Sequence, residues 1–522
     1  MKRRINFMTL PGIFLFIASS LFSVNEPFYL MLTAAQLVFV PMILQLLVEV
    51  KTKHIVATWT AMASIFLLHI GLPMNAQILF GFIYLMFTLF VALYGVKRFF
   101  MRGFTNWAEI SIDIGMMFLF VGGLWFFAYV AQINTGFSPL LTWLTAIHFH
   151  YSAFLLPVFV GFFGRLHESK WYKVCVPILL AGPLLVALGI TFWPLLEVIS
   201  VVLYIFALYT LIYLVFQTHF PSKIQAFCVR LSFFTLAITI LFSLMYASNS
   251  AFGKWGISID LMLLFHGLAN CIFFGMFGVL GWVWLPPKTK QPVWEFPVSK
   301  IRGSFKSEGE KKSGLVKDLS EYVNTQRLPS SIIDFYEHTE NYHLVAAVRW
   351  ASWFKPFALF YKLISNKIQQ INLPVSSKPV EMTGSIEAVD ESLDGRPNPR
   401  VWKRNIGTNG VFKAIYSYHQ TNNRTFMNIA LPLPFSAMIG ILQLDEKDGT
   451  LILSSKGEPD AGVYLAVGRF LFKLPLSEYF VIKESTNNTL TATHKMTIFG
   501  LPFLTISYEM SLKNVSGKTN IS

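Results

Sequence analysis

The most regular feature of the sequence is a series of long apolar runs that ends near residue 285. Ten such runs follow one another, separated by short polar breaks or by proline and glycine. A bilayer core of about 30 Å needs about 20 apolar residues per helix, because peptide groups cannot be left unpaired in hydrocarbon. We predict about ten spans, near residues 6–24, 28–48, 55–72, 76–96, 111–131, 140–163, 174–190, 194–216, 229–247 and 259–285.

The pattern changes after residue 285. Residues 286–314 are rich in proline, lysine, serine, glycine and glutamate, which is typical of a linker. Residues 315–376 have the amphipathic spacing of helices, and residues 377–522 show the alternation of half-buried strands, with turn signals at intervals of about 10–14 residues. The predicted fold class is an all-α membrane bundle (1–285), followed by a cytoplasmic α+β domain with an antiparallel β-barrel or curled sheet of about eight to ten strands.

Composition agrees with this division. The chain is 54% hydrophobic and only 13% charged, whereas soluble domains carry about 25% charged residues. A single soluble globule is therefore excluded. The three cysteines, Cys175, Cys228 and Cys271, have no paired spacing and indicate neither a disulfide framework nor a zinc cluster.

Basic residues alternate between the two sets of connections. Within residues 1–285, thirteen Lys and Arg residues fall in one set, and only Lys254 falls in the other. Because basic loops are retained in the cytoplasm, we predict a multi-pass protein of the cell membrane with both termini cytoplasmic. The net charge of +14 then reflects topology and an acidic leaflet, so we predict the lipid bilayer as a partner and no nucleic acid.

Polar and ionisable side chains inside the spans are the first functional candidates, since a charged group at the bilayer centre costs about 2.5–3.5 kcal/mol. With the predicted orientation, the candidates all fall in the outer half of the bilayer or at its outer surface. They are His69, His148, His150, Glu197, Asp260, His266 and Asn270. We predict an outward-facing intramembrane polar site.

Four of these residues, His69, His148, Glu197 and His266, would form a metal site if their helices converged. Neutral imidazoles with a carboxylate suit zinc, iron or copper, and two histidines from different helices suit haem. Alternatively, each histidine hydrogen-bonds a neighbouring helix and only orders the bundle. Both interpretations stay open, and the sequence identifies no cofactor and no catalytic residue.

Glu109 and Asp113 are four residues apart at the cytoplasmic start of the fifth span, so both carboxylates project from one face. They are secondary candidates for a proton or cation entry site. The alternative is that they cap the start of the helix, where negative charge is favourable. We favour capping for Glu109 and leave Asp113 open.

The end of the helical lead-in combines aromatic and basic side chains, among them Arg349, Trp350, Trp353, Lys355 and Lys362. Such a helix either lies on the inner leaflet, whose anionic lipids attract Lys and Arg, or covers one end of the barrel. We favour the covering role, because a curled sheet needs its open end closed.

Strand alternation predicts which side chains point into the barrel. Two runs mix large and small residues, as either a cavity or a filled core would: Phe412, Ala414, Tyr416 and Tyr418, and Tyr464, Ala466, Gly468 and Phe470. Four polar residues are the first to consider in the interior, although a hydrogen-bonded or exposed position is more common for such residues. They are Arg404, His419, Arg469 and His494.

Short motifs carry two family resemblances. With Thr9-Leu10-Pro11-Gly12 and Thr145-Ala146-Ile147-His148-Phe149-His150-Tyr151, the membrane part resembles the uncharacterised bacterial YndJ-like membrane proteins. With Leu474-Pro475-Leu476 and Phe499-Gly500-Leu501-Pro502-Phe503, the C-terminal part resembles an uncharacterised bacterial β-rich domain that follows short-chain-dehydrogenase-like modules. Neither resemblance implies an activity.

The preferred hypothesis is a binding or transport-linked membrane protein. Its β-domain would recognise an apolar or lipid-like molecule at the inner leaflet, and its intramembrane His and carboxylate residues would form a separate outward site. A metal- or haem-dependent membrane enzyme that uses the His cluster is the first alternative, and a structural scaffold is the second.

Overall fold

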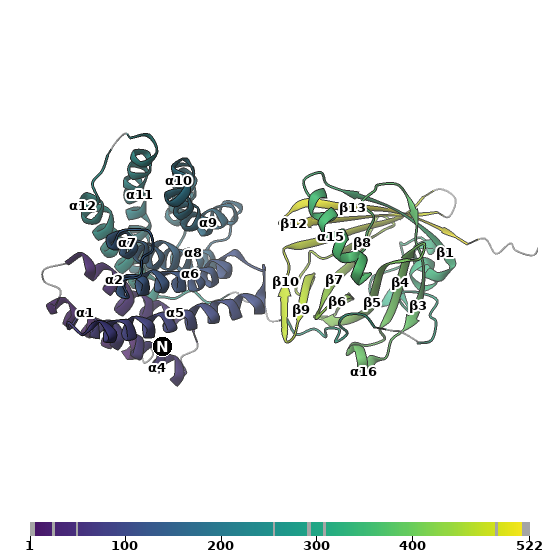
Figure 1. Cartoon of the computed structure of the whole chain (residues 1–522). Helices are drawn as coiled ribbons and strands as arrows, with labels where there is room; N and C mark the ends of the chain where they lie inside the picture. The colour runs from purple at the N-terminus through teal and green to yellow at the C-terminus, as the bar shows by residue number, and fades with distance from the viewer. Residues whose placement is uncertain are drawn as a thin grey trace, which may run out of the picture. The chain divides into compact units, whose positions relative to one another are not determined.

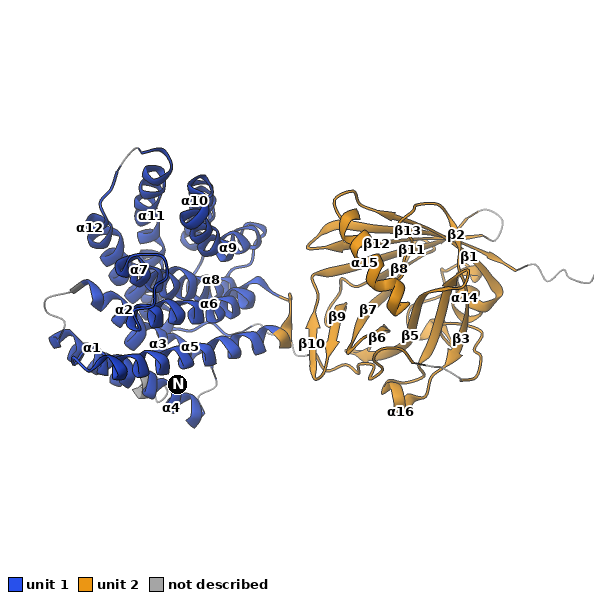
Figure 2. Ribbon diagram, in the orientation of Figure 1, with its two compact units in different colours: residues 1–99, 106–291 blue, residues 100–105, 292–522 orange. Residues whose placement is uncertain are grey.

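The structure is a computed structural model, and it describes residues 6–22, 27–48, 51–253, 256–289, 294–305, 309–485 and 489–513. Four of the basic residues counted above for the orientation, Lys2, Arg3, Arg4 and Lys254, lie outside these ranges. The chain forms two compact units (Figures 1 and 2). Unit 1 comprises Met1–Phe99 and Asn106–Gln291, and unit 2 comprises Phe100–Thr105 and Pro292–Ser522.

Unit 1 is a bundle of helices (Figure 1). Its α-helices are α1 (Asn6–Phe22), α2 (Leu30–Ala34), α3 (Val40–Leu47), α4 (Thr52–Leu67), α5 (Met74–Arg102), α6 (Trp107–Val130), α7 (Pro139–His150), α8 (Leu156–Leu166), α9 (Lys170–Phe192), α10 (Pro194–Gln217), α11 (Lys223–Phe252), α12 (Ile259–Leu261) and α13 (Phe277–Trp284). Some are joined without a break by the wider π-helical turns η2 (Ala35–Phe39), η3 (Tyr151–Leu155), η4 (Met262–Gly267) and η5 (Asn270–Met276).

Eight continuous helical segments in the described part of the chain are long and apolar enough to cross a membrane. The prediction of about ten spans is therefore too high by this criterion, because the first and third predicted spans form shorter helices, α1 with 17 residues and α4 with 16. Residue His69, just after α4, nevertheless hydrogen-bonds Thr33 in α2 at 3.1 Å. The start of α4 follows directly after the end of α3, and its other end lies next to α2. Helix α4 therefore runs alongside the whole segment Leu30–Leu47.

Two of the wide turns have a simple sequence cause. Pro41 and Pro157 each follow a π-helical turn and have no backbone N–H to donate to it, so the preceding carbonyls need other partners. The turns η2, η3 and η5 meet around Tyr151, whose hydroxyl donates a hydrogen bond to the Met31 carbonyl at 2.7 Å. The surrounding segments, Leu30–Leu47 and Pro139–Leu166, are the most buried of the eight.

One buried carboxylate joins several helices of unit 1. Glu109, at the start of α6, accepts two hydrogen bonds from Arg165 at the end of α8, at 2.7 and 2.9 Å. It accepts a third from Arg98 near the end of α5 at 3.1 Å, and a fourth from the Thr289 hydroxyl at 2.9 Å. Glu109 and Arg165 are both buried, so the charges compensate one another out of water.

Arg98 extends this network to two more groups. Its Nε donates to Asp113 at 2.7 Å, and its Nη1 donates to the Leu47 carbonyl at the end of α3 at 2.8 Å. The N-cap of α6 is Asn106, whose side chain accepts from the backbone N–H groups of Ala108 and Glu109, and Glu109 lies in the first turn, where negative charge is favourable.

Unit 2 is a 13-stranded antiparallel sheet that curls into a nearly closed barrel (Figure 2). Its order is β2-β1-β13-β12-β11-β8-β7-β6-β5-β4-β3, with β9 paired to β7 and β10 paired to β9. The strands are β1 (Tyr342–Trp350), β2 (Val380–Glu381), β3 (Thr383–Ala388), β4 (Arg400–Ile406), β5 (Asn409–Thr421), β6 (Arg424–Leu433), β7 (Ser436–Lys447), β8 (Thr450–Ser454), β9 (Gly462–Val467), β10 (Phe470–Lys473), β11 (Leu476–Glu484), β12 (Leu490–Ile498) and β13 (Leu501–Leu512).

The two edges of this sheet meet at Met382, the one residue between β2 and β3. The outer edge of β3 is covered by the preceding chain, since Lys312 donates to the Ile386 carbonyl and Ala388 donates to the Glu310 carbonyl. The barrel interior holds the larger hydrophobic core, which the segment from Leu315 to α14 (Ser330–Glu337) closes at one end. The edge of β3 is therefore not left as an open template for another strand.

The predicted lead-in and linker differ from the structure. Strand β1 lies inside the segment predicted to be helical, and the helix α15 (Lys355–Ile368) follows it. Part of the predicted linker packs on the outside of the barrel, where Trp294, Phe296 and Phe305 join a second hydrophobic core. The sheet also has more strands than the predicted eight to ten.

The division into units constrains the topology. Unit 2 contains both the connection Phe100–Thr105 between α5 and α6 and the chain from Pro292 onward. Placing both segments on one side of the membrane requires an even number of spans between them. Six of the eight candidate spans occupy that interval.

We expect Glu109→Gln to lower the free energy of unfolding by about 3 kcal/mol, because Arg165 would keep its buried charge without the compensating carboxylate and Arg98 would keep only Asp113 of its two acidic partners. Thermal unfolding of the purified full-length protein measures the effect. Glu168→Gln, at an exposed carboxylate just after α8, is the matched control and should change stability by less than about 0.5 kcal/mol. Equal unfolding temperatures for the two variants would contradict the network's structural role.

Candidate functional site

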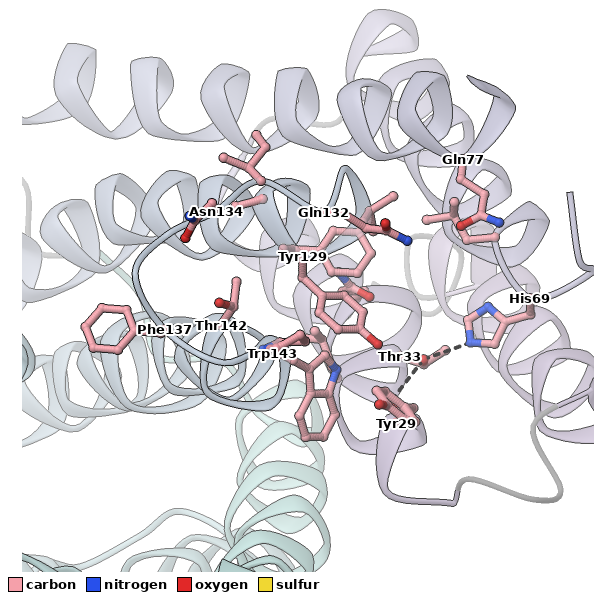
Figure 3. Close-up of a pocket in the computed structure, with 18 of the residues that line it drawn as sticks. Tyr29, Thr33, His69, Gln77, Tyr129, Gln132, Asn134, Phe137, Thr142 and Trp143 are labelled. Atoms are coloured by element: carbon pink, nitrogen blue, oxygen red, sulfur yellow. Dashed lines mark hydrogen bonds between the residues drawn. The ribbon is translucent and has the colours of Figure 1, made fainter. Parts of the chain in front are cut away.

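A pocket of about 680 Å³ opens in unit 1 among α2, α6, α7 and the residues after α4 (Figure 3). His69 and Thr33 lie on one side of it, and Asn134 and Thr142 lie on the other (Figure 3). The Nδ1–H of His69 donates to the Ile65 carbonyl at 2.9 Å, so its Nε2 is left to accept from the Thr33 hydroxyl. His69 is thus the one predicted intramembrane candidate that lines this pocket.

The pocket has an aromatic wall and an uncharged polar lining. Tyr29 packs edge-on against Trp143, with ring centroids 4.9 Å apart, and stacks against Tyr129 at 6.2 Å. The polar lining consists of hydroxyl, amide and imidazole groups, and no Asp, Glu, Lys or Arg is among the lining residues that the structure describes. This chemistry suits a neutral polar or amphipathic molecule.

A polar group at the base of the pocket leads deeper into the bundle. Gln36, in η2, lines the pocket and interacts with the Tyr84 hydroxyl. Tyr84 donates to the Nε2 of His150 at 2.8 Å, and the Nδ1–H of His150 donates to the Ala146 carbonyl. His150 is completely buried and is held by these two bonds.

The other predicted intramembrane residues lie elsewhere. The His148 and His266 rings stack with centroids 6.4 Å apart, and each Nδ1–H donates to a backbone carbonyl, of Leu144 and Thr239. Asn270, which follows on the same helix, accepts from the Thr239 hydroxyl at 3.0 Å.

The two acids among the predicted intramembrane residues, Glu197 and Asp260, are separate from the pair formed by His148 and His266. Glu197 is buried near Ser250, and Asp260 is exposed at the start of α12. Within the described chain, no group of three or more His, Cys, Asp or Glu side chains is arranged to hold a metal ion. The four metal candidates, His69, His148, Glu197 and His266, are therefore not brought together.

Unit 2 contains a second candidate site inside the barrel. Along β6, β7, β11 and β12, the inward side chains near the closed end are buried, whereas those toward the other end are partly accessible. On β7, for example, Leu442 and Leu444 are buried, but Met438 and Gly440 are partly accessible. The barrel is therefore filled at the end closed by α14, and we call the partly accessible interior toward the opposite end the cup.

Polar side chains converge at mid-depth in this cup. The Arg404 guanidinium lies between the Trp402 and Phe412 rings, 4.4 Å from each centroid, and it interacts with the Tyr508 hydroxyl. Glu478 on β11 and His494 on β12 face the same space, with Oε2 and Nε2 3.9 Å apart. Among the described residues, Arg404 Nε and His494 Nε2 have no hydrogen-bond partner, although both residues are more than nine-tenths buried.

Burial sets the protonation of this cluster. Removal from water raises the pKa of Glu478 to about 7. Removal from water, reinforced by the charge of Arg404, lowers the pKa of His494 to about 3. Because His494 is neutral and 3.9 Å exceeds a hydrogen bond, Glu478 and His494 do not form an ion pair.

Several predicted interior residues take other positions. Phe412 and Tyr416 do belong to the interior core, and so do Arg404 and His494. Tyr464 and Ala466, however, pack in the second core outside the barrel, because β9 pairs beside β7 with its buried face toward Phe296. His419 joins that outer core next to Asp460 at 3.3 Å, and Arg469 is exposed in the turn between β9 and β10.

The aromatic and basic helix predicted near the barrel is α15. Trp350 at the end of β1 donates to the Pro374 carbonyl, and Trp353 donates to the Pro502 carbonyl. Lys362 is held by Asn372 and the Leu373 carbonyl. Arg349 and Lys355 are exposed.

Sequence reasoning missed Gln36 and Glu478, although both leave a signal. Gln36 is an amide in the middle of an otherwise apolar span. Glu478 shares its strand face with Leu476, Phe480 and Ile482, so the alternation alone points it inward.

The long apolar helices and the barrel-like sheet define a membrane protein with a separate β-domain. The chain belongs to the YndJ-like family, whose model, described as YndJ-like protein, matches residues 30–274. It is 36% identical over 455 residues to the protein named "Uncharacterized membrane protein YndJ" of Bacillus subtilis (strain 168). The aligned region covers 83% of each chain. No solved structure matches the chain.

Glu478→Gln should stabilise unit 2 at alkaline pH. The pKa of Glu478 is about 7 in the folded chain and 4.5 unperturbed, so folding is penalised as pH rises from 4.5 to 7, by about 3 kcal/mol at pH 8. The variant should unfold at a higher temperature than the wild type at pH 8, and the difference should vanish near pH 4.5. Calorimetry of the full chain tests this, and a pH-independent difference would contradict it.

Proposed function

We propose that the protein is a binding or transport-linked membrane protein of the cell membrane with two ligand sites and both termini in the cytoplasm. The β-domain takes an apolar or lipid-like molecule into its cup. The pocket beside His69 is a separate outward-facing site for a neutral polar or amphipathic molecule.

The partly accessible inward side chains in one half of the barrel carry this proposal. A barrel that served only as a scaffold would bury its inward side chains along its whole length. On β12, Leu490 and Ala492 are buried in this way, but Met496 and Ile498 are partly accessible. The accessible walls are mostly apolar, and the few polar groups at mid-depth would orient one end of a bound molecule. This pattern favours a ligand with an apolar body and a polar end.

The alternation of basic residues supports the orientation, and the even number of spans between Thr105 and Pro292 agrees with it. With α5 ending on the cytoplasmic side, the pocket at the start of α5, lined by Gln77, faces outward. The enzyme alternative lacks comparable support, since the described residues assemble no metal-binding group.

Gly440→Phe tests the cup directly. A Cβ at Gly440 would have only Glu478 Oε2 near it, at 3.8 Å, so a larger side chain fills the hollow without displacing backbone. We expect the full-length variant to bind a fluorescent polyene fatty acid at least about tenfold more weakly than the wild type, a loss of about 1.4 kcal/mol. Gly440→Ala, which adds one methyl group, should bind normally. Equal binding by the wild type and Gly440→Phe would refute the cup as the ligand site.

Asn134→Cys tests the outward pocket. In a background with serine at the three native cysteines, a membrane-impermeant maleimide should label this exposed pocket residue in intact cells. Glu168→Cys, in a connection rich in basic residues, should be labelled only after the cells are opened. The reverse pattern would overturn the proposed orientation.

A further inference from the structure

One end of the barrel is apolar on its outer surface. Strand pairing places six connections at this end, opposite α14, because the antiparallel register brings Leu476 beside Ile498, Leu433 beside Ser436 and Trp350 beside Leu504. We name these connections the open rim. The open rim comprises residues 351–379, which include α15, and residues 407–408, 434–435, 468–469, 474–475 and 499–500, with the strand ends that flank them.

Large apolar side chains are exposed along the open rim. Phe435 is 91% exposed, and Phe360 and Leu363 on α15 are 68% and 66% exposed. The other exposed apolar residues there are Trp353, Phe357, Leu359, Ile364, Val467, Phe499 and Leu501. Elsewhere in the described part of residues 294–513, only Leu393, Tyr479 and Leu512 are large, apolar and exposed. Such a concentration of exposed apolar side chains at one end of a domain is typical of an interaction surface.

Helix α15 lies across the rim with its apolar face outward. Before its start, Trp353 donates to the Pro502 carbonyl in the β12–β13 hairpin. After its end, Gln370 donates to the carbonyls of Lys413 and Pro432 on β5 and β6. Within the helix only Ala358 and Ser365 are buried, so contacts with the barrel leave its large side chains unused.

Charge is divided between the two ends of the barrel. The open-rim connections contain no Asp or Glu, but they contain Lys355, Lys362, Lys367, Lys378 and Arg469. The segments at the closed end, residues 313–341, 389–399 and 448–449, contain nine Asp and Glu against three Lys and Arg. An anionic surface would therefore attract the open rim and repel the closed end.

The open rim also carries a segment that continues into membrane helices. Residues Phe100–Thr105 belong to unit 2, where Phe104 donates to the Lys473 carbonyl at 2.8 Å and its ring packs edge-on against Phe499 at 5.3 Å. This segment joins α5 to α6 directly. The rim is thus tied by covalent chain, within a few residues, to the ends of two candidate spans.

From the exposed apolar patch, the one-sided positive charge and this tether, we infer that the open rim docks on the surface of an anionic lipid bilayer, with the outer face of α15 inserted among the lipid headgroups. Aromatic and aliphatic side chains bury in the interface, and Lys355 and Lys367 pair with acidic headgroups. The partner is the bilayer itself, and this inference does not require the cup to bind a ligand.

Nitroxide labels on the full-length protein in vesicles test the docking. Single cysteines at Phe360 and Leu363 should be more accessible to apolar oxygen than to a water-soluble nickel chelate, and this preference should be stronger in vesicles with phosphatidylglycerol than in phosphatidylcholine alone. Leu393→Cys is the matched control, because Leu393 is 65% exposed but lies near the closed end. Its label should report water in both lipids.

Labels at Phe360 and Leu363 that match the Leu393 control would overturn the inference, as would labels shielded from both reagents, which would indicate a protein partner. Lys355→Glu with Lys367→Glu should abolish the dependence on phosphatidylglycerol. If a cysteine variant fails to fold, photoactivatable phosphatidylglycerol can be crosslinked to the unaltered protein. Peptides from residues 353–367 should then carry the lipid, and crosslinks confined to the spans would refute the docking.

Discussion

The buried carboxylate of Glu109 fixes how the ends of several helices meet. It joins α6 to α5 through Arg98, to α8 through Arg165 and to the chain after α13 through Thr289, and Arg98 adds the end of α3. Hydrophobic packing cannot select among neighbours in lipid, because the tails are as apolar as the side chains. The buried charge of Glu109, by contrast, is stable only beside its two arginines. It therefore specifies one arrangement of the helices that carry these residues.

The sequence predicts local features of this fold well and long-range partnerships poorly. The spans follow from hydrophobic length, and the strands follow from alternation, as the face of Leu490, Ala492 and His494 illustrates. The role of Glu109 did not follow, because its partners are 11, 56 and 180 residues away in the chain. Strand β1 was missed for a related reason: it is half of a pairing whose other half, β13, ends the described chain.

The membrane histidines show why depth alone does not define a site. His69, His148 and His150 share one solution, in which the Nδ1–H donates to the carbonyl four residues earlier on the same helix. Each ring is then held by the chain segment that carries it. The rotation of that segment decides which neighbour the Nε2 atom faces. Convergence of several rings would need matched helix rotations, which a single sequence does not reveal. Of these three histidines, His69 lines the pocket of Figure 3.

Glu109 is a buried acid and Glu478 a largely buried one, and their surroundings are opposite. Two guanidinium groups compensate the charge of Glu109, so the protein itself supplies the partners that its burial requires. Glu478 has no such match, since the nearby Arg404 is held between two aromatic rings and His494 is neutral. Burial without compensation raises the pKa of Glu478, and the Nε atom of Arg404 and the Nε2 atom of His494 have no hydrogen-bond partner among the described residues. A fold does not need that arrangement, whereas a polar ligand group entering the hollow would satisfy those atoms.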